Sequence, residues 1–267
     1  MFDVAGLNMH ARVLGEGEPV VLVHGCGVSG TYMLPLAQSL ASSFTVFVPD
    51  LPGCGRSQRP TAPLGISELA DALADWLDAA GLECPAFVAN SMGCQVATQL
   101  AVRRPDQTGP LVLVGPTVDP QRPTTRHQLL AGLRETWREP PALVALAARD
   151  EARFGVGALL ATLRSAIADR IEERLPLIAQ PTVVVRGERD HFVGQQWAER
   201  AAALLPQGRL VVLAGQPHAA HYTRPDLVAG IVRDLLVEEG EQAGSELPGR
   251  LPHRHVPAVE AYQAGTG

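Results

Sequence analysis

Short runs of Val, Leu and other apolar residues alternate along the chain with longer segments in which apolar residues recur every three or four positions. The short runs are typical of strands buried on both faces, and the longer segments are typical of amphipathic helices. Strands are predicted at 9–14, 20–23, 45–48, 86–89, 111–114, 182–185 and 209–213. Helices are predicted at 34–41, 67–80, 92–103, 195–205 and 225–237. This order indicates an α/β fold, in which helices cover both faces of a mostly parallel sheet.

The alternation of strands and helices stops between about 116 and 180, where a proline-rich entry leads into helical segments without a strand. Apolar residues in this region form stripes at helical spacing, at Leu129, Leu130, Leu133 and Trp137, and again from Leu159 to Ile167. We therefore expect a helical lid at 119–178, inserted into a core made of 1–118 and 179–239. The residues 240–267 lack periodicity, and we expect them to form a weakly ordered tail.

Composition narrows the possible partners. With 22 basic and 28 acidic side chains the net charge is −6, which disfavours nucleic acid. No apolar run approaches the ~20 residues of a membrane span, and no leader pattern is present, so we expect a cytoplasmic protein that binds no membrane. The four cysteines form no C-x-x-C pair and no zinc-ligand spacing, so we expect free thiols and no metal. A homodimer remains one of the open oligomeric states.

The candidate nucleophile is Ser91. It follows the apolar strand at 86–89 and directly precedes a helix, an arrangement typical of a nucleophile elbow. Residues two before and two after the serine must be small in such a sharp turn, and Ala89 and Gly93 are small. Because Ala89 replaces the more usual glycine of G-x-S-x-G, an ordinary serine N-cap is the alternative interpretation.

A second apolar strand, at 20–23, ends in His24-Gly25-Cys26-Gly27. Glycines allow a close approach of the backbone, so this loop can direct a main-chain N–H group at a developing oxyanion. Phosphate-binding glycine motifs are missing from the chain, and we expect no cofactor. His24 is interpreted as a brace of the loop rather than as a catalyst.

A serine nucleophile needs a base, and the base needs a carboxylate to fix its tautomer. Asp190 follows the strand at 182–185, and His218 follows the strand at 209–213. The order serine, acid, histidine at successive strand ends is the order of a nucleophile-elbow hydrolase. Asp119, just after the strand at 111–114, is the alternative acid.

Together these motifs make the chain resemble the α/β-hydrolase family from about Asn8 to Val237. The resemblance implies an eight-stranded sheet, a helical lid between strands six and seven, and the triad Ser91, Asp190 and His218. It also implies that the backbone N–H groups of Cys26 and Met92 bind the oxyanion. The pocket for a small-molecule substrate is expected to include Gly25, Asn90, Trp137, Phe154, Leu163 and His221.

We expect a serine hydrolase that cleaves a small, fairly apolar ester or lactone through an acyl-enzyme. A serine at position 91 excludes the branches that use a carboxylate nucleophile, such as haloalkane dehalogenases and epoxide hydrolases. Asn90-Ser91-Met92-Gly93 is also similar to the elbow of hydrolases that cleave carbon–carbon bonds in meta-cleavage products, so C–C hydrolysis is one alternative. A thioesterase is a second alternative. A cyclase or a ligand receptor that reuses the pocket is the alternative from another class.

Overall fold

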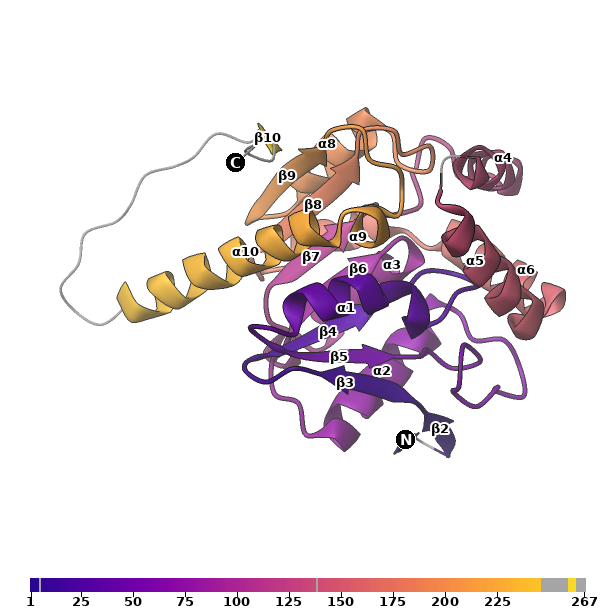
Figure 1. The fold of residues 1–267 in the computed structure, drawn as a ribbon, viewed down its shortest axis with the longest axis horizontal. Coiled ribbons are helices and arrows are strands. Elements are labelled where there is room, and N and C mark those ends of the chain that lie inside the picture. Colours follow the sequence, from indigo (N-terminus) through magenta and orange to yellow (C-terminus); the bar gives the residue numbers. More distant parts are fainter. Residues whose placement is uncertain (5, 138, 246–258, 263–267) are drawn as a thin grey trace.

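The computed structural model describes residues 1–4, 6–137, 139–245 and 259–262 (Figure 1). Its main feature is a sheet with the strand order β10-β9-β8-β7-β6-β4-β5-β3, in which β3 is antiparallel to β5 and all other neighbours are parallel. The strands are β3 (Ala11–Leu14), β4 (Pro19–Val23), β5 (Thr45–Pro49), β6 (Ala86–Asn90), β7 (Leu111–Val114), β8 (Thr182–Gly187), β9 (Gly208–Leu213) and β10 (Val259–Tyr262). This architecture confirms the α/β fold class predicted from the sequence.

Helices cover both faces of the sheet. One face packs against α1 (Leu34–Leu40) and α10 (Pro225–Ser245), and the other packs against α2 (Ile66–Ala80), α3 (Met92–Arg103) and α8 (Gln195–Leu204). Successive strand residues point to opposite faces, so Val20 and Leu22 of β4 contribute to one core, and Val21 and Val23 contribute to the other. The 3-10 helix η1 (Gly30–Met33) and the short helix α9 (Ala220–Thr223) also contribute buried residues to the core, whereas the 3-10 helix η2 (Pro105–Gln107) contributes none.

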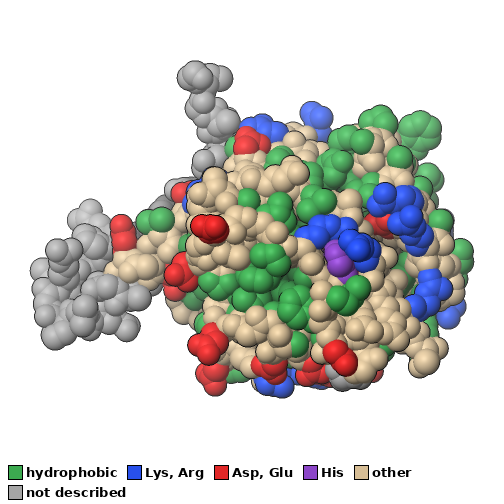
Figure 2. Space-filling view, turned by 60° about the horizontal axis from the view of Figure 1, so that its bottom comes forward, with side chains coloured by type: hydrophobic (Ala, Val, Ile, Leu, Met, Phe, Trp, Pro, Cys, Tyr) green, Lys and Arg blue, Asp and Glu red, His purple; other side chains and the backbone are tan. Residues whose placement is uncertain are grey.

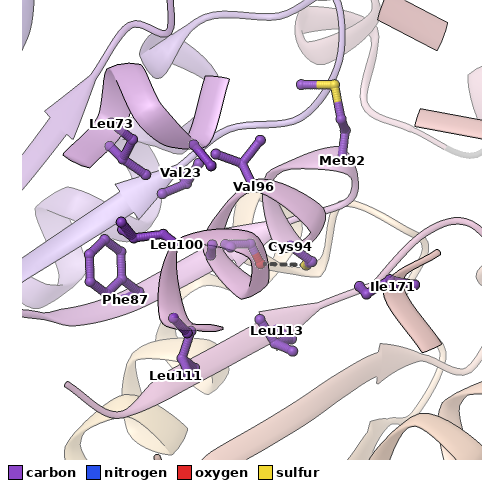
Figure 3. Close-up of a cluster of buried hydrophobic side chains, with 14 of the residues drawn as sticks. Val23, Leu73, Phe87, Met92, Cys94, Val96, Leu100, Leu111, Leu113 and Ile171 are labelled. Carbon is purple, nitrogen blue, oxygen red and sulfur yellow. Dashed lines mark hydrogen bonds between the residues drawn. The ribbon is translucent and has the colours of Figure 1, made fainter. Parts of the chain in front are cut away.

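The core on the side of α3 is densely apolar, and Figure 3 shows part of it. Phe87 comes from β6 and Leu111 and Leu113 come from β7, while Val96 and Leu100 come from α3. Each of these five side chains is at most 1% exposed. The first turn of α3 is therefore held against the sheet by packing along the rest of the helix.

Among the described residues between β7 and β8, the regular elements are helices, joined by loops. They are α4 (Thr125–Thr136), α5 (Pro141–Phe154), α6 (Val156–Ala168), α7 (Ile171–Arg174) and the 3-10 helix η3 (Leu175–Leu177). In Figure 1, α4, α5 and α6 gather at one side of the molecule, beyond the edge of the sheet where most strands end. Gln95 of α3 anchors this insertion because its Nε2 donates to the backbone oxygen of Ala166, at 2.8 Å.

Two sequence expectations need correction. The strand predicted at 9–14 is divided at His10: β2 (Leu7–Met9) pairs with β1 (Phe2–Val4), and β3 pairs with β5. His10 lies at the division, and its Nδ1 is 3.0 Å from Oδ2 of the buried Asp50.

The second correction concerns the C-terminus. Helix α10 does not end at Val237 but continues to Ser245, through a run rich in Glu and Gln that favours helix. Strand β10 lies beyond it and pairs with β9. The other residues of the predicted tail, 246–258 and 263–267, lie outside the described residues.

Apolar side chains also reach the surface of the molecule, in patches among polar ones (Figure 2). Among the described residues, no helix combines the length and the apolar character that a membrane span requires.

The core packing generates a stability prediction. Leu100→Ala removes a side chain that is 1% exposed, so we expect it to lower the free energy of unfolding by about 2–5 kcal/mol in urea titrations. The matched control is Leu129→Ala, because that leucine is 59% exposed and its loss should change stability by less than about 0.5 kcal/mol. Equal losses for the two variants would contradict this assignment of the core.

Candidate active site

The candidate catalytic residues lie where parallel strands end, at one edge of the sheet. Ser91 follows β6, Gly25 and Cys26 follow β4, Asp190 follows β8 and His218 follows β9. In the strand order, β9 and β6 are separated by β8 and β7. The side chain of a histidine on the loop after β9 must therefore extend across the ends of β8 and β7 to approach a serine that follows β6.

The turn at Ser91 has the backbone conformation of a nucleophile elbow. Its φ of 56° and ψ of −124° are unusual for a residue with a side chain. The backbone N–H of Ser91 donates to Val114 O at 3.0 Å, and that of Cys94 donates to Ser91 O at 2.9 Å, which begins α3. Gly93 is required here, since a Cβ atom on it would lie 2.5 Å from Val23 O.

Asp190 and His218 form a buried hydrogen-bonded pair. Nδ1 of His218 lies 2.8 Å from Oδ2 of Asp190. The other carboxylate oxygen, Oδ1, accepts the backbone N–H groups of Phe192 and Val193 at 2.7 and 2.9 Å. These bonds fix the carboxylate, which in turn orients the imidazole so that Nε2 points away from Asp190.

Nε2 of His218 is buried and has no hydrogen-bond partner among the described residues. No hydrogen bond therefore joins Nε2 of His218 to Ser91 Oγ. Such catalytic bonds are commonly long without substrate and shorten in the reactive complex. An imidazole nitrogen that is free in this position is an available proton acceptor.

Gly115, directly after β7, gives the imidazole its path across the sheet. Its φ is +58°, and a Cβ atom on it would lie 2.8 Å from the ring of His218 and 3.1 Å from Asp190. A side chain at this position would displace the imidazole of His218. Sequence analysis missed Gly115, although a glycine directly after a predicted buried strand was a usable signal.

The alternative acid, Asp119, does not contact His218. Its Oδ1 accepts the backbone N–H of Gln121 at 2.9 Å, so its carboxylate caps a local turn. Asp190 is the carboxylate that the structure brings to the imidazole.

Two backbone N–H groups after β4 and β6, those of Cys26 and Met92, donate to no acceptor in the described part of the chain. His24 braces their loop: its Nδ1 lies 2.9 Å from Gly25 O, and its Nε2 accepts the N–H of Leu51 at 3.0 Å. Both ring nitrogens of His24 are thereby occupied, and burial lowers the pKa of its imidazole, so a neutral ring fits this role.

A cavity of about 140 Å³ adjoins this region. Gly27 and Met92 lie on its wall next to the free N–H groups, and Phe154, Ala158 and Thr162 of the insertion close it. The rest of the wall comes from the segment that follows β5, and most of its side chains are apolar, with Arg59 the charged exception: Leu51, Pro52, Gly53, Cys54, Arg59, Pro60, Thr61, Pro63, Leu64 and Leu69.

The six residues expected to form the pocket do not all lie on the wall of this cavity. Phe154 lines the cavity. Gly25 and Asn90 flank the serine instead: a Cβ on Gly25 would lie 3.2 Å from Ser91 Cβ, and Asn90 Nδ2 donates to Val114 O at 3.1 Å. His221 is fully buried, with its ring centroid 4.5 Å from that of Tyr32.

The predicted pocket roles of two residues of the insertion are wrong. Trp137 is 85% exposed and so does not line the cavity. The half-buried Leu163 is also absent from the cavity wall, where Thr162 stands in its place. The physical reason is the same for both: helical spacing identifies the apolar face of a helix but not the partner that this face meets.

Two glutamates of the insertion, which sequence analysis did not single out, reach the loop that carries His218. Glu135 of α4 accepts the backbone N–H of His218 at 3.2 Å, and Glu139 accepts that of Ala219 at 3.2 Å. Burial raises the pKa of Glu139 to about 7. No motif marks either residue, because they resemble the solvated charges of any surface helix.

No cluster of three or more His, Cys, Asp or Glu side chains suited to a metal ion occurs within the described residues.

Comparison with known proteins identifies the family. A family model described as "Alpha/beta hydrolase family" matches residues 20–231. The chain therefore belongs to the alpha/beta hydrolase family, and the esterases and hydrolases among its relatives make it an enzyme of the hydrolase class.

Particular relatives differ in how much of their length is matched. The chain is 32% identical over 250 residues to the polyketide synthase ThaQ of Burkholderia thailandensis. The aligned region covers 84% of this chain but only 12% of that synthase. The chain is 27% identical to a pimeloyl-[acyl-carrier protein] methyl ester esterase of Stenotrophomonas maltophilia, covering 85% of this chain and 96% of the relative. The solved structure of Est816, described as an N-acyl homoserine lactone degrading enzyme, superposes with a TM-score of 0.75 at 25% identity, covering 87% and 98%.

The geometry of the two carboxylates predicts a contrast between their amide variants. We expect Asp190→Asn to lower the turnover of the best ester substrate by about 10³–10⁴-fold, because the amide favours the wrong imidazole tautomer. Asp119→Asn is the matched control and should keep most of the activity. A dead Asp119 variant beside an active Asp190 variant would contradict this assignment of the acid.

Proposed function

We propose that this protein is a serine hydrolase that cleaves small, fairly apolar esters or lactones through an acyl-enzyme on Ser91. One observation carries the proposal: a serine in the elbow conformation shares a strand-end edge with the Asp190–His218 pair, and that pair leaves Nε2 free. The esterase and lactone-degrading relatives support the same class of reaction.

In the proposed mechanism, Oγ of Ser91 bonds to the carbonyl carbon while His218 Nε2 takes the hydroxyl proton. The negative charge on the former carbonyl oxygen is bound by the N–H groups of Cys26 and Met92. The intermediate then loses its alkoxide, which leaves as the alcohol after taking the proton from the imidazolium. Water repeats the sequence on the acyl-enzyme, so the products are one acid and one alcohol, or a hydroxy acid from a lactone.

The cavity sets the expected size of the substrate. An apolar cavity of about 150 Å³ binds a molecule the size of benzene. The cavity beside Met92, at about 140 Å³, is similar. We propose that it holds one apolar group of about this size, and that the inserted helices act as a lid over it.

The proposed setting is a cytoplasmic one. All four cysteines, Cys26, Cys54, Cys84 and Cys94, are unpaired, which fits a reducing compartment.

Ser91→Ala tests the proposed nucleophile. We expect it to abolish labelling by a small fluorophosphonate and to lower ester hydrolysis by several orders of magnitude, while the unfolding midpoint stays close to that of the parent. A panel of ester, lactone, thioester and diketone substrates on the parent enzyme identifies the bond. Retention of more than about a tenth of the parent rate by the Ser91 variant would refute the acyl-enzyme.

Phe154→Ala tests the proposed binding cavity. This side chain is 8% exposed and lines the cavity, so its removal should raise kcat/KM for octanoate relative to butyrate esters by about tenfold. Trp137→Ala, which removes an 85% exposed ring from the same insertion, is the control and should leave the ratio unchanged. If both variants leave the ratio at the parent value, the substrate binds elsewhere.

A further inference from the structure

Helix α4 packs with its polar face inward. Its buried positions are Gln128, Ala131 and Glu135, at 6%, 2% and 4% exposure, whereas the leucines at 129 and 133 are each 59% exposed. This is the reverse of the usual amphipathic arrangement. Burying a carboxylate is costly unless it is hydrogen-bonded, so the partners of Glu135 indicate why the helix lies this way round.

Glu135 joins the two loops that carry the acid and the base. Its Oε1 accepts the backbone N–H of His191, the residue after Asp190, at 2.7 Å. Its Oε2 accepts the backbone N–H of His218 itself, at 3.2 Å. One side chain from the insertion thus contacts both loops, next to the hydrogen bond between Asp190 and His218.

We propose that Glu135 is a positioning residue: from α4 it holds the acid loop and the base loop in register, so that the inserted helices set the geometry and the working pH range of the Asp190–His218 pair. This inference rests on the proposed function, because it takes Asp190 and His218 as the catalytic acid and base.

The charges around His218 define the expected pH effect. Burial by itself lowers the pKa of its imidazole, but Asp190, Glu135 and Glu139 outweigh burial and raise the pKa overall. The other titratable groups nearby are His221 of α9, Tyr32 of η1, and Arg186 of β8, which faces Asp190 and Glu135.

A base must be neutral to accept a proton, so a raised imidazole pKa places the acid limb of the pH–rate profile at higher pH. Loss of the charge at Glu135 should therefore move the acid limb to lower pH. A mere loss of packing would slow the reaction without moving that limb.

The test measures, across pH, the second-order rate constant for fluorophosphonate labelling of Ser91 in the whole 267-residue chain. Glu135→Gln removes the charge and leaves a single acceptor oxygen for two N–H groups. We expect labelling about 10- to 100-fold slower at the optimum, with the acid limb at lower pH. Glu135→Asp keeps the charge but has a shorter reach, so we expect slower labelling with the acid limb unchanged.

Glu173→Gln is the matched control, because that carboxylate also belongs to the insertion but its side chain is 67% exposed. It should label like the parent. The inference is overturned if Glu135→Gln labels at the parent rate, or if it labels slowly with an unmoved acid limb. If the parent itself is not labelled at Ser91, the proposed function fails instead. If Glu135→Gln does not fold, Glu135→Asp is the deciding variant. Labelling of Glu135→Asp at the parent rate would then overturn the inference.

Discussion

The active edge of this molecule depends on the close approach between the start of α3 and the end of β4. Ser91 takes a backbone conformation that costs about 1–3 kcal/mol for a residue with a side chain. Three contacts hold it there: its N–H bonds to Val114, its carbonyl accepts from Cys94, and Gly93 fits against the carbonyl of Val23. The same turn leaves the N–H of Met92, at the first helical position, without an acceptor among the described residues, so one backbone constraint places both the candidate nucleophile and a candidate anion-binding donor.

A second constraint is distance across the sheet. Asp190 and His218 follow neighbouring strands, but β8 and β7 separate His218 from the serine at the end of β6. The end of β8 and the loop after β9 lie so close together that a Cβ on Gly187 would clash with the backbone oxygen of Pro217. Gly115 then clears the end of β7 for the imidazole. Two glycines therefore determine where the imidazole of His218, the candidate base, lies.

The sequence predicted the parts of this arrangement that depend on local pattern. Val20 to Val23 and the other buried strands show continuous apolar runs, and the α3 segment shows helical spacing, so the fold class could be inferred without the structure. The pairing of the first strands could not be inferred, because strand partners can be distant in the chain: β2 pairs with the adjacent β1, whereas β3 pairs with the distant β5. The position of Trp137 could not be inferred either, since periodicity predicts a face and leaves its partner undetermined.

The inverted packing of α4 follows from the hydrogen-bonding needs of the loops beneath it. Loops at the ends of parallel strands present backbone N–H groups that have left the sheet, and a buried N–H without an acceptor is destabilising. An apolar helix face could cover His191 and His218 but could not accept their N–H groups, whereas the carboxylate of Glu135 accepts both. Exposing three leucines to water is the cost of this arrangement, and it is modest beside that of leaving charge-assisted hydrogen bonds unmade next to the candidate base. The need of the strand-end loops for hydrogen-bond acceptors, more than the apolar pattern of the helix, thus determines which face of α4 packs against these loops.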